Sequence, residues 1–369
     1  MKFNTAAIIA TFVFMLKKKT ILVAPLNWGL GHATRCVPII RALLHHNFEV
    51  LIATDGPALL LLRKEFSELE YLELPSYNIT YPKNGSYFKL KMFLKFPNIQ
   101  KTINAEKKIV KRLVASRKIQ GIISDNRFGV RNANVPSVFI THQLNVLTGS
   151  TSFFSSKLHQ RIIKKFDVCW VPDVENSFIN LSGKLGHLRH KNFPTKYIGV
   201  LSRMDKKVIK KFVDILVIIS GPEPQRTLFE QKLKETLNET EKKVIIIRGC
   251  FEKEQKWQNC QNLKTVNFMT TAELEHYINA SELIISRPGY TTLMDLTALE
   301  KKAFFIPTPG QYEQKYLAKR LKNLGIAPFC EQKKFTLKKL NEVSDYRGLK
   351  NIQQAPLNYA DLFSLFQSK

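Results

Sequence analysis

The chain has 369 residues, enough for two domains of ordinary size, and its 44% hydrophobic and 24% charged residues are typical of a globular protein. Its 57 Lys and Arg outnumber 30 Asp and Glu, and the net charge of +27 favours an anionic partner: nucleic acid, an anionic membrane surface or a phosphorylated substrate. The five cysteines form no CxxC or Cys/His cluster, which argues against a disulfide framework or structural zinc and favours a reducing, cytoplasmic setting.

An apolar run, Ala6 to Leu16, lies near the N-terminus and is followed by Lys17 to Lys19. The run is too short to cross a bilayer, and no small-x-small cleavage site follows it. We therefore interpret residues 1–14 as an upstream extension or a weak anchor.

The first half of the chain alternates short apolar runs with helical periodicity. Strands are predicted at 20–25, 48–53 and 71–74, with helices at 33–46 and from Pro57 onwards. A glycine loop, 26–32, joins the first strand to the first helix. This β-α-β-α-β order is typical of a parallel sheet with right-handed crossovers.

Residues 76–100 break this rhythm. Tyr87 to Phe96 interleaves aromatic, aliphatic and lysine side chains, which suits a surface that dips into a membrane interface beside anionic headgroups. The alternative is a helix that buries its apolar face and leaves its lysines in solvent. A long basic helix is predicted from Ile99 to Ser116.

Three further strands of this half end in polar residues. They are predicted at 121–124, 137–140 and 168–171, and they end at Asp125, at Thr141 and His142, and at Pro172 and Asp173. Ligands of parallel sheets bind at the carboxyl ends of the strands.

The pattern restarts near residue 200. Strands are predicted at 214–219, 244–248, 264–267, 283–285 and 303–306, with helices between them, and an amphipathic run spans Tyr359 to Phe366. We predict an α/β chain whose two Rossmann-like domains face a cleft. The segments are an N-terminal extension (1–19), a first domain (20–200), a linker (201–212), a second domain (213–345) and a C-terminal tail helix (346–369).

The stretch from Leu283 to Asp295 predicts a buried strand, a Pro-Gly turn and a helix start. A helix start presents free N–H groups and a positive dipole end, which suits a phosphate. Thr291 and Thr292 are candidate caps, and Asp295 lies one turn further on the same face, about 5.4 Å along the axis. The stretch therefore suits a nucleoside diphosphate whose ribose hydroxyls bind Asp295. The alternative is an ordinary strand–helix corner with a surface aspartate.

These features together resemble glycosyltransferases of the GT-B fold, in particular family 28 and its MurG-type members. The segment Gly29-Leu30-Gly31-His32 is similar to the family's first glycine loop, which faces the acceptor and the donor diphosphate. The segment Thr141 to Asn145 resembles the family's His-Glu-Gln-Asn segment, of which His142 and Asn145 match. The resemblance makes the first domain the acceptor side and the second domain the nucleotide-sugar side.

The resemblance also implies donor-binding residues in the second domain. Ser286-Arg287-Pro288-Gly289 is similar to the family's donor motif, with Asp295 in place of a ribose-binding glutamate. The loop from Pro307 to Gln314 looks like the one that holds the donor sugar, and Glu313 is our extension of it. The implied donor set is Ser220, Gly221, Arg226, Phe268, Met269, Ser286, Arg287, Gly289, Thr291, Thr292, Asp295, Glu313 and Gln314, with Arg287 and the helix start facing the leaving diphosphate.

An inverting transfer needs a base for the acceptor hydroxyl. His32, after two glycines, is one candidate, and its alternative role is a hydrogen bond to a phosphate. Asp125 is the rival base, or else a cap for the following turn. His142 is expected to shape the acceptor cleft, and Arg35 either meets a phosphate or lies solvated on its helix.

The sequence thus predicts a metal-independent inverting glycosyltransferase that uses a nucleotide diphosphate sugar, most readily UDP-linked, as co-substrate and no cofactor. No Asp-x-Asp metal motif is present. The expected acceptor is a glycan or lipid-linked sugar at the inner face of the cytoplasmic membrane. One alternative is a UDP-sugar hydrolase or epimerase, because Gly29 to Arg35 also resembles the loop of such enzymes. Another is a basic protein that binds nucleic acid or membrane without catalysis, although no nucleic-acid-binding motif is found.

Overall fold

The computed structural model describes residues 18–78, 88–175, 179–250, 252–350, 352 and 357–367, and within 88–96 it describes the backbone only. The predicted extension at 1–14 lies outside these residues. So do the side chains of the apolar and basic surface predicted at 87–96.

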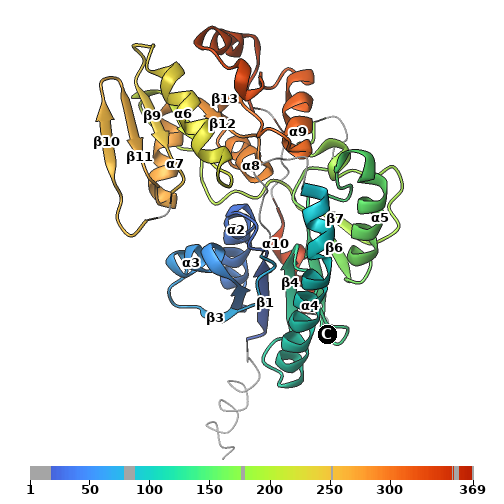
Figure 1. Cartoon of the computed structure of the whole chain (residues 1–369). Helices are drawn as coiled ribbons and strands as arrows, with labels where there is room; N and C mark the ends of the chain where they lie inside the picture. Colours follow the sequence, from blue (N-terminus) through green and yellow to red (C-terminus); the bar gives the residue numbers. More distant parts are fainter. Residues whose placement is uncertain are drawn as a thin grey trace, which may run out of the picture.

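The first half of the chain forms a seven-stranded parallel sheet in the order β3-β2-β1-β4-β5-β6-β7 (Figure 1). Its strands are β1 (Thr20–Pro25), β2 (Glu49–Thr54), β3 (Glu70–Glu73), β4 (Gly121–Asp125), β5 (Ser137–Ile140), β6 (Val168–Val171) and β7 (Thr195–Tyr197). Its helices are α2 (Gly31–His45), α3 (Gly56–Glu65), α4 (Phe88–Ala115) and α5 (Ser152–Ile163), with short 3-10 turns at Gly149–Thr151 and Gly183–Leu185.

The second half forms a six-stranded sheet in the order β10-β11-β9-β8-β12-β13, in which only β10 runs antiparallel to its neighbour. Its strands are β8 (Val213–Ile218), β9 (Val244–Ile247), β10 (Trp257–Cys260), β11 (Leu263–Val266), β12 (Ser281–Ser286) and β13 (Lys302–Phe305). Its helices are α6 (Gln225–Leu237), α7 (Thr271–Ala280), α8 (Tyr290–Ala298) and α9 (Tyr312–Asn323), followed by 3-10 turns at Gln332–Lys334 and Leu337–Asp345.

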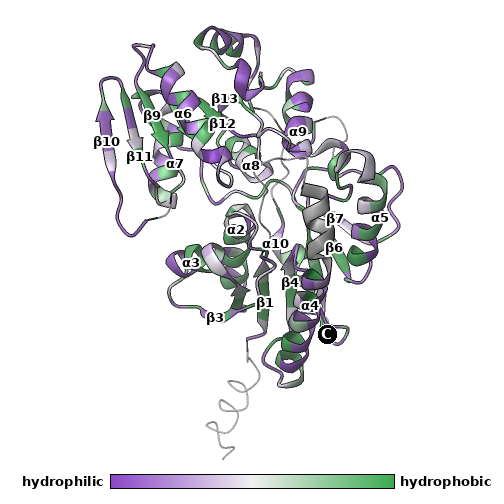
Figure 2. Ribbon diagram, viewed as in Figure 1, coloured by the Kyte–Doolittle hydropathy of each residue, from purple (hydrophilic) through white to green (hydrophobic). Residues whose placement is uncertain are grey.

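Burial explains why these segments form central strands. All five residues of β4 and five of the six residues of β1 are buried, as expected for strands that helices cover on both faces. Figure 2 shows the same layering, with hydrophobic strands inside and hydrophilic helix surfaces outside. The fold class predicted from the sequence, α/β with two Rossmann-like units, is confirmed.

Strand order fixes where ligands can bind in each half. In the first sheet the order reverses between β1 and β4, and in the second between β8 and β12. Loops that leave such neighbouring strands in opposite directions open a crevice at their carboxyl ends. His32 follows β1, Asp125 ends β4 and Ser286 ends β12, so candidate residues lie at both crevices.

The C-terminal segment returns to the first half. There α10 (Tyr359–Phe363) and a 3-10 turn (Ser364–Phe366) bury Phe363 and Phe366 against Phe48 and Trp170, with ring centroids 5.9–6.4 Å apart. Burying an aromatic side chain typically stabilises a fold by about 1.5–3 kcal/mol. The tail predicted at 346–369 thus contains a short helix that fastens the end of the chain to the first sheet.

None of the helices in the described part of the chain combines the length and the apolar character needed to span a bilayer.

Candidate functional site

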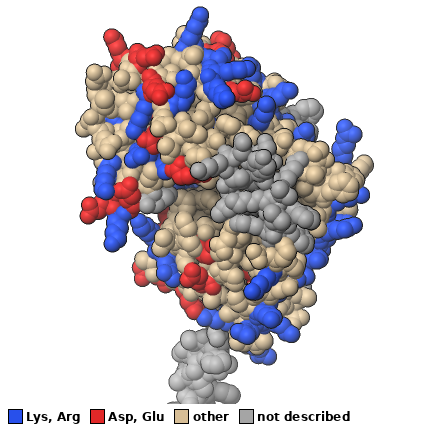
Figure 3. Space-filling view, in the orientation of Figure 1, with Lys and Arg blue, Asp and Glu red and all other residues tan. Residues whose placement is uncertain are grey.

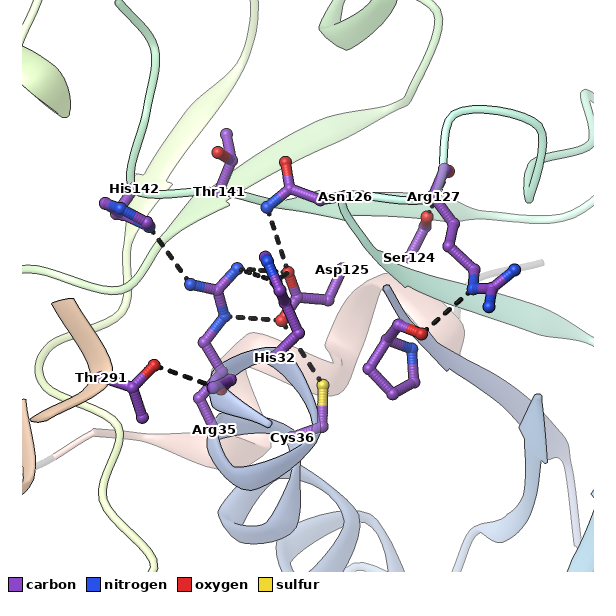
Figure 4. A network of polar contacts seen from close by, with 12 residues as sticks. His32, Arg35, Cys36, Ser124, Asp125, Asn126, Arg127, Thr141, His142 and Thr291 are labelled. Atoms are coloured by element: carbon purple, nitrogen blue, oxygen red, sulfur yellow. Dashed lines mark hydrogen bonds and ion pairs between the residues drawn. The ribbon is translucent and has the colours of Figure 1, made fainter. Parts of the chain in front are cut away.

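The first crevice holds a histidine–aspartate pair. His32 lies in the first turn of α2, and its Nδ1 is 2.8 Å from Oδ1 of Asp125, the last residue of β4 (Figure 4). Asp125 is fully buried, whereas 15% of the His32 side chain is exposed. Within the described residues, Nε2 of His32 has no hydrogen-bond partner, so this nitrogen remains available to a ligand.

Arg35 holds the aspartate from the other side. Its Nε donates to Oδ2 of Asp125 at 2.5 Å, and its Nη2 donates to Oδ1. Nη2 also lies 2.8 Å from Nδ1 of His32. The ionised carboxylate of Asp125 can only accept hydrogen bonds, and it already accepts one from Nη2 of Arg35. We therefore assign the proton of His32 to Nδ1, which donates it to Asp125.

The electrostatics of the pair favour a neutral imidazole beside an ionised carboxylate. Burial lowers the pKa of His32 below its ordinary value, and Arg35 adds to this effect against the opposing pull of Asp125. Burial alone would raise the pKa of Asp125, but Arg35 and then His32 outweigh it and hold that pKa well below its usual range. Neutral His32 can therefore accept a proton at neutral pH, whereas both oxygens of Asp125 are engaged.

His142 connects this pair to the second half of the molecule. Its Nδ1 lies 3.2 Å from Nη1 of Arg35, and its Nε2 lies 2.9 Å from Oε1 of Glu313 in α9. The other oxygen of Glu313 accepts a hydrogen bond from Nε2 of Gln143 at 2.5 Å. The His142 ring stacks on Tyr290 of α8, with centroids 4.0 Å apart and planes inclined by 3°. Tyr290 in turn donates from its hydroxyl to the backbone oxygen of Pro172 at 2.8 Å.

The start of α8 contacts the glycine loop directly. Thr291 Oγ1 donates to the backbone oxygen of Gly31 at 3.2 Å. A Cβ atom on Gly31 would lie 2.8 Å from that hydroxyl, so this close approach of loop and helix requires glycine. Gly29, in the same loop, has a φ of +75°, which also favours glycine.

The helix start itself has the features of an anion site. Gly289 is the N-cap of α8, and no side chain caps the helix there. Ser286, at the end of β12, is buried, and its Oγ has no hydrogen-bond partner among the described residues. Free helix N–H groups and an unsatisfied buried hydroxyl suit a phosphate oxygen. Thr292, in the same helical turn, is partly exposed.

Arg287 holds the loop after β13, a role that the sequence did not predict. It is buried, and its Nη1 donates to the backbone oxygens of Ile306 and Pro307 at 2.9 and 3.0 Å. Its guanidinium also stacks on the ring of Phe229, 3.7 Å from the centroid. Its Nε is buried without a hydrogen-bond partner among the described residues, so the expectation that Arg287 faces a leaving diphosphate stays a prediction.

Asp295 lies in α8, one turn after the helix start, as predicted. Its Oδ1 accepts a hydrogen bond from Ser202 Oγ at 2.8 Å, a linker residue that the sequence analysis missed. Burial raises the pKa of Asp295 to about 6, although Ser202 and Arg203 oppose the shift.

The remaining donor-side candidates follow strands of the second sheet or lie in α6. Ser220 and Gly221 are exposed after β8, whereas Phe268 and Met269 are nearly buried after β11. Arg226 is engaged within its own half, where it pairs with Glu223 and donates to the backbone oxygen of Arg248.

Two further candidates shape loops. Gln314 Oε1 accepts from the backbone N–H of Thr308 at 2.8 Å and so braces the loop after β13. Asn145 Nδ2 donates to the backbone oxygen of Lys184 at 2.7 Å.

Arg35 is neither solvated nor directed at a phosphate, since its guanidinium is committed to Asp125 and His142.

Sequence reasoning missed Tyr290, Gln143 and Ser202. An aromatic residue directly after a Pro-Gly turn signals a side chain at a helix start, but nothing local indicates its stacking partner in the first half of the chain. In the described ranges, no three His, Cys, Asp or Glu side chains are grouped so that they could hold a metal ion.

Comparison with known proteins finds similarity to glycosyltransferases. The sequence model of the Glycosyltransferase family 28 C-terminal domain matches residues 215–360. A UDP-N-acetylglucosamine–N-acetylmuramyl-(pentapeptide) pyrophosphoryl-undecaprenol N-acetylglucosamine transferase from Clostridium tetani (strain Massachusetts / E88) is 26% identical over 363 residues, covering 92% of this chain and 94% of the relative. The protein of the same name from Sulfurihydrogenibium sp. (strain YO3AOP1) is 26% identical over 154 residues, so the match spans 39% of this chain and 42% of that relative, less than half its length.

Solved structures show the same fold. The crystal structure of Acinetobacter baumannii MurG matches with a TM-score of 0.55 at 15% identity, covering 95% of this chain and 100% of that one. Two Rossmann-like halves, the second of which matches the family 28 domain, define the GT-B fold of these glycosyltransferases. Within that class the chain resembles glycosyltransferase family 28 and its MurG-type members, so the resemblance predicted from the sequence is confirmed.

Proposed function

We propose that this protein is a metal-independent, inverting glycosyltransferase that moves a sugar from a UDP-sugar to a hydroxyl of a lipid-linked acceptor. N-acetylglucosamine is the proposed sugar, because the relatives are named for its transfer. The observation that carries the proposal is the His32–Asp125 pair with its free Nε2, next to Gly31, which the start of α8 contacts.

His32 acts as the general base in this proposal. Its Nε2 takes the proton of the acceptor hydroxyl while the oxygen bonds to the anomeric carbon of the donor sugar. The bond from that carbon to the diphosphate breaks, and its electron pair leaves with UDP. Attack from the side opposite the diphosphate inverts the anomeric centre. Asp125 keeps Nδ1 protonated and stabilises the imidazolium that forms, as a carboxylate does for other histidine bases.

The leaving diphosphate is assigned to the start of α8. Its N–H groups, its dipole and the unsatisfied Ser286 hydroxyl offset the developing negative charge. Asp295 lies one turn further along, where it can accept the ribose hydroxyls beside Ser202, which donates to its Oδ1. This arrangement supplies the charge stabilisation without a divalent cation, which is the basis for proposing metal independence.

We place the acceptor at an anionic membrane surface. In α5, Phe153, Phe154 and Leu158 are 61%, 73% and 51% exposed, and Lys157 lies over the Phe153 ring at 4.5 Å. The segment 149–166 contains four Lys or Arg residues and no Asp or Glu. Figure 3 shows Lys and Arg along the flank that α5 occupies in Figure 1. Exposed rings beside cations suit a membrane interface with anionic headgroups, which would place the enzyme at the inner face of the cytoplasmic membrane.

A turnover assay tests the proposed reaction. Protein with EDTA is given UDP-N-acetylglucosamine, with and without lipid-linked N-acetylmuramyl acceptor, and UDP and glycosylated lipid are quantified. The proposal predicts UDP release that depends on acceptor and equals product formation. UDP release at several turnovers per second without acceptor would instead identify a hydrolase, and turnover that returns only with Mg²⁺ would refute metal independence. Retention on heparin without any response to sugar nucleotides would favour a nucleic-acid-binding or membrane-binding protein.

A further inference from the structure

Glu313 joins the two halves of the molecule at the proposed catalytic centre. It lies in the first turn of α9, in the second half, and both of its carboxylate oxygens are bonded to residues that follow β5 in the first half. The sequence predicts a contact between Glu313 and the donor sugar. In the structure, the carboxylate is instead hydrogen-bonded to His142 and Gln143.

The hydrogen bonds through His142 have a defined direction. Arg35 has only donors, so Nδ1 of His142 accepts from its Nη1, and Nε2–H donates to Glu313. Stacking on Tyr290 fixes the plane of the ring, and only 9% of the His142 side chain is exposed. His142 is therefore a rigid bridge between a carboxylate of the second half and a guanidinium of the first.

The bridge continues to His32. Arg35 holds both oxygens of Asp125, and Asp125 holds Nδ1 of His32. The path from Glu313 to His32 passes through three side chains, all buried and each bonded to the next (Figure 4 shows the part from His142 to His32). A shift of α9 relative to the first sheet would therefore break the bonds of Glu313 to His142 and Gln143. The path that orients His32 would then lose its anchor in the second half.

We propose that Glu313 is a positioning residue that, through His142, Arg35 and Asp125, orients His32 only when the two halves are closed. Glu313 thus couples cleft closure to the readiness of the proposed base. The role of His32 as base rests on the proposed function, whereas the coupling is a property of the protein alone. The titratable groups that face this path are Cys36 of α2, His159 of α5 and Tyr290 of α8.

Titration of His32 by NMR tests the coupling without any turnover. The eight histidines are labelled with ¹³C, and His32→Asn identifies the His32 signal. The titration midpoint of His32 is measured in wild type, Glu313→Gln, His142→Ala and the double variant. Glu342→Gln is the matched control, because Glu342 pairs with Lys339 in an exposed ion pair of the same half.

We expect Glu313→Gln to move the His32 midpoint by several tenths of a pH unit or more, and Glu342→Gln to leave it in place. In the His142→Ala background, Glu313→Gln should have no further effect, because contacting residues in one network are non-additive. An equal shift in both backgrounds would show a direct field effect, and no shift in either would show no coupling. Both results overturn the proposal.

Kinetics separate the coupling from a donor-sugar contact. If Glu313 positions His32, Glu313→Gln lowers kcat about tenfold or more and changes the KM for the UDP-sugar little, since the lost interaction acts on the base. A raised KM with unchanged kcat would return Glu313 to sugar binding and contradict the positioning role. A protein that turns over no UDP-sugar would still give the NMR result, so failure of the proposed function and failure of this inference are distinguishable.

Discussion

His32 and Asp125 illustrate how environment assigns roles to single residues. Both were candidate bases, and they lie 2.8 Å apart in the same crevice. The carboxylate is fully buried and both of its oxygens are bonded to Arg35, whereas the imidazole is partly exposed and keeps one nitrogen free. The geometry therefore favours His32 as the proton acceptor and Asp125 as the group that orients it.

Replacing His32 by Gln should lower kcat about 10²–10⁴-fold, the usual contribution of a general base, and leave UDP binding unchanged. In the wild type, kcat/KM should fall on acidification only below the ordinary histidine range, because the pKa of free-enzyme His32 is lowered by burial. A pH–rate profile with and without the substitution checks both statements. A variant that kept its activity would transfer the role of base to another group.

Asp295 is expected to lower the stability of the fold and to strengthen the binding of UDP. Its folded-state pKa of about 6 exceeds the value of about 3.9 in unfolded chains, so the ionised folded state carries a cost that appears as pH rises from about 4 to 6. The cost is at most about 3 kcal/mol, and partial exposure reduces it. Asp295→Asn should thus raise the Tm at pH 8 but not at pH 4. The same substitution should weaken the binding of UDP. A Tm at pH 8 equal to or below that of wild type would contradict the assigned pKa.

At the scale of elements, apolar runs located the central strands well. The predictions for β1, β5 and β6 match residue for residue, because buried parallel strands carry continuous apolar sequences. β7 and β10 were missed. Their sequences, Thr-Lys-Tyr and Trp-Gln-Asn-Cys, are mostly polar. Both strands lie at the edges of their sheets and contain no buried residue, so they lack the apolar runs of central strands.

The contact between the glycine loop and α8 gives a prediction for two elements together. Gly31→Ala would place a methyl group 2.8 Å from Thr291 Oγ1 and push α8 away from α2. We expect a loss of about 10–100-fold in kcat/KM, since misplacement of about 1 Å has effects of that size. Adding Thr291→Ala removes the clashing hydroxyl and should restore part of the loss. Steady-state kinetics of both variants decide the matter, and an unimpaired Gly31→Ala would mean that the halves need not approach so closely.

At the scale of the whole molecule, the contacts between the two halves could not be predicted from the sequence. Each half of the site was predicted as a crevice. His142–Glu313 joins the two halves over 171 positions, and Ser202–Asp295 joins the linker to the second half over 93. Local pattern carries no information on such pairs. The same limit explains why the contact of Arg287 with the loop after β13 was not predicted, since only the packed structure shows it.

The charge of the whole molecule and the surface of α5 predict membrane binding. Wild-type protein should sediment with phosphatidylglycerol vesicles and not with phosphatidylcholine vesicles, because each surface Lys or Arg adds about 1 kcal/mol on an anionic bilayer. Phe153→Ser with Phe154→Ser should weaken this binding about 100-fold or more, since burying each such ring is worth about 1.5–3 kcal/mol. Leu60→Ser, at a residue 62% exposed on α3, is the control. Equal binding of both variants would exclude α5 as the docking surface.

The most direct test of the glycosyltransferase assignment is a thermal-shift measurement with UDP, GDP, dTDP and CMP in EDTA, on wild type and Asp295→Ala. A ligand at 100 times its Kd adds about 2.7 kcal/mol of stability, which such a scan resolves. We predict that UDP alone stabilises the wild type strongly and that Asp295→Ala loses most of the shift. If no nucleotide shifted the wild type, the donor site at the start of α8, and with it the proposed reaction, would be contradicted.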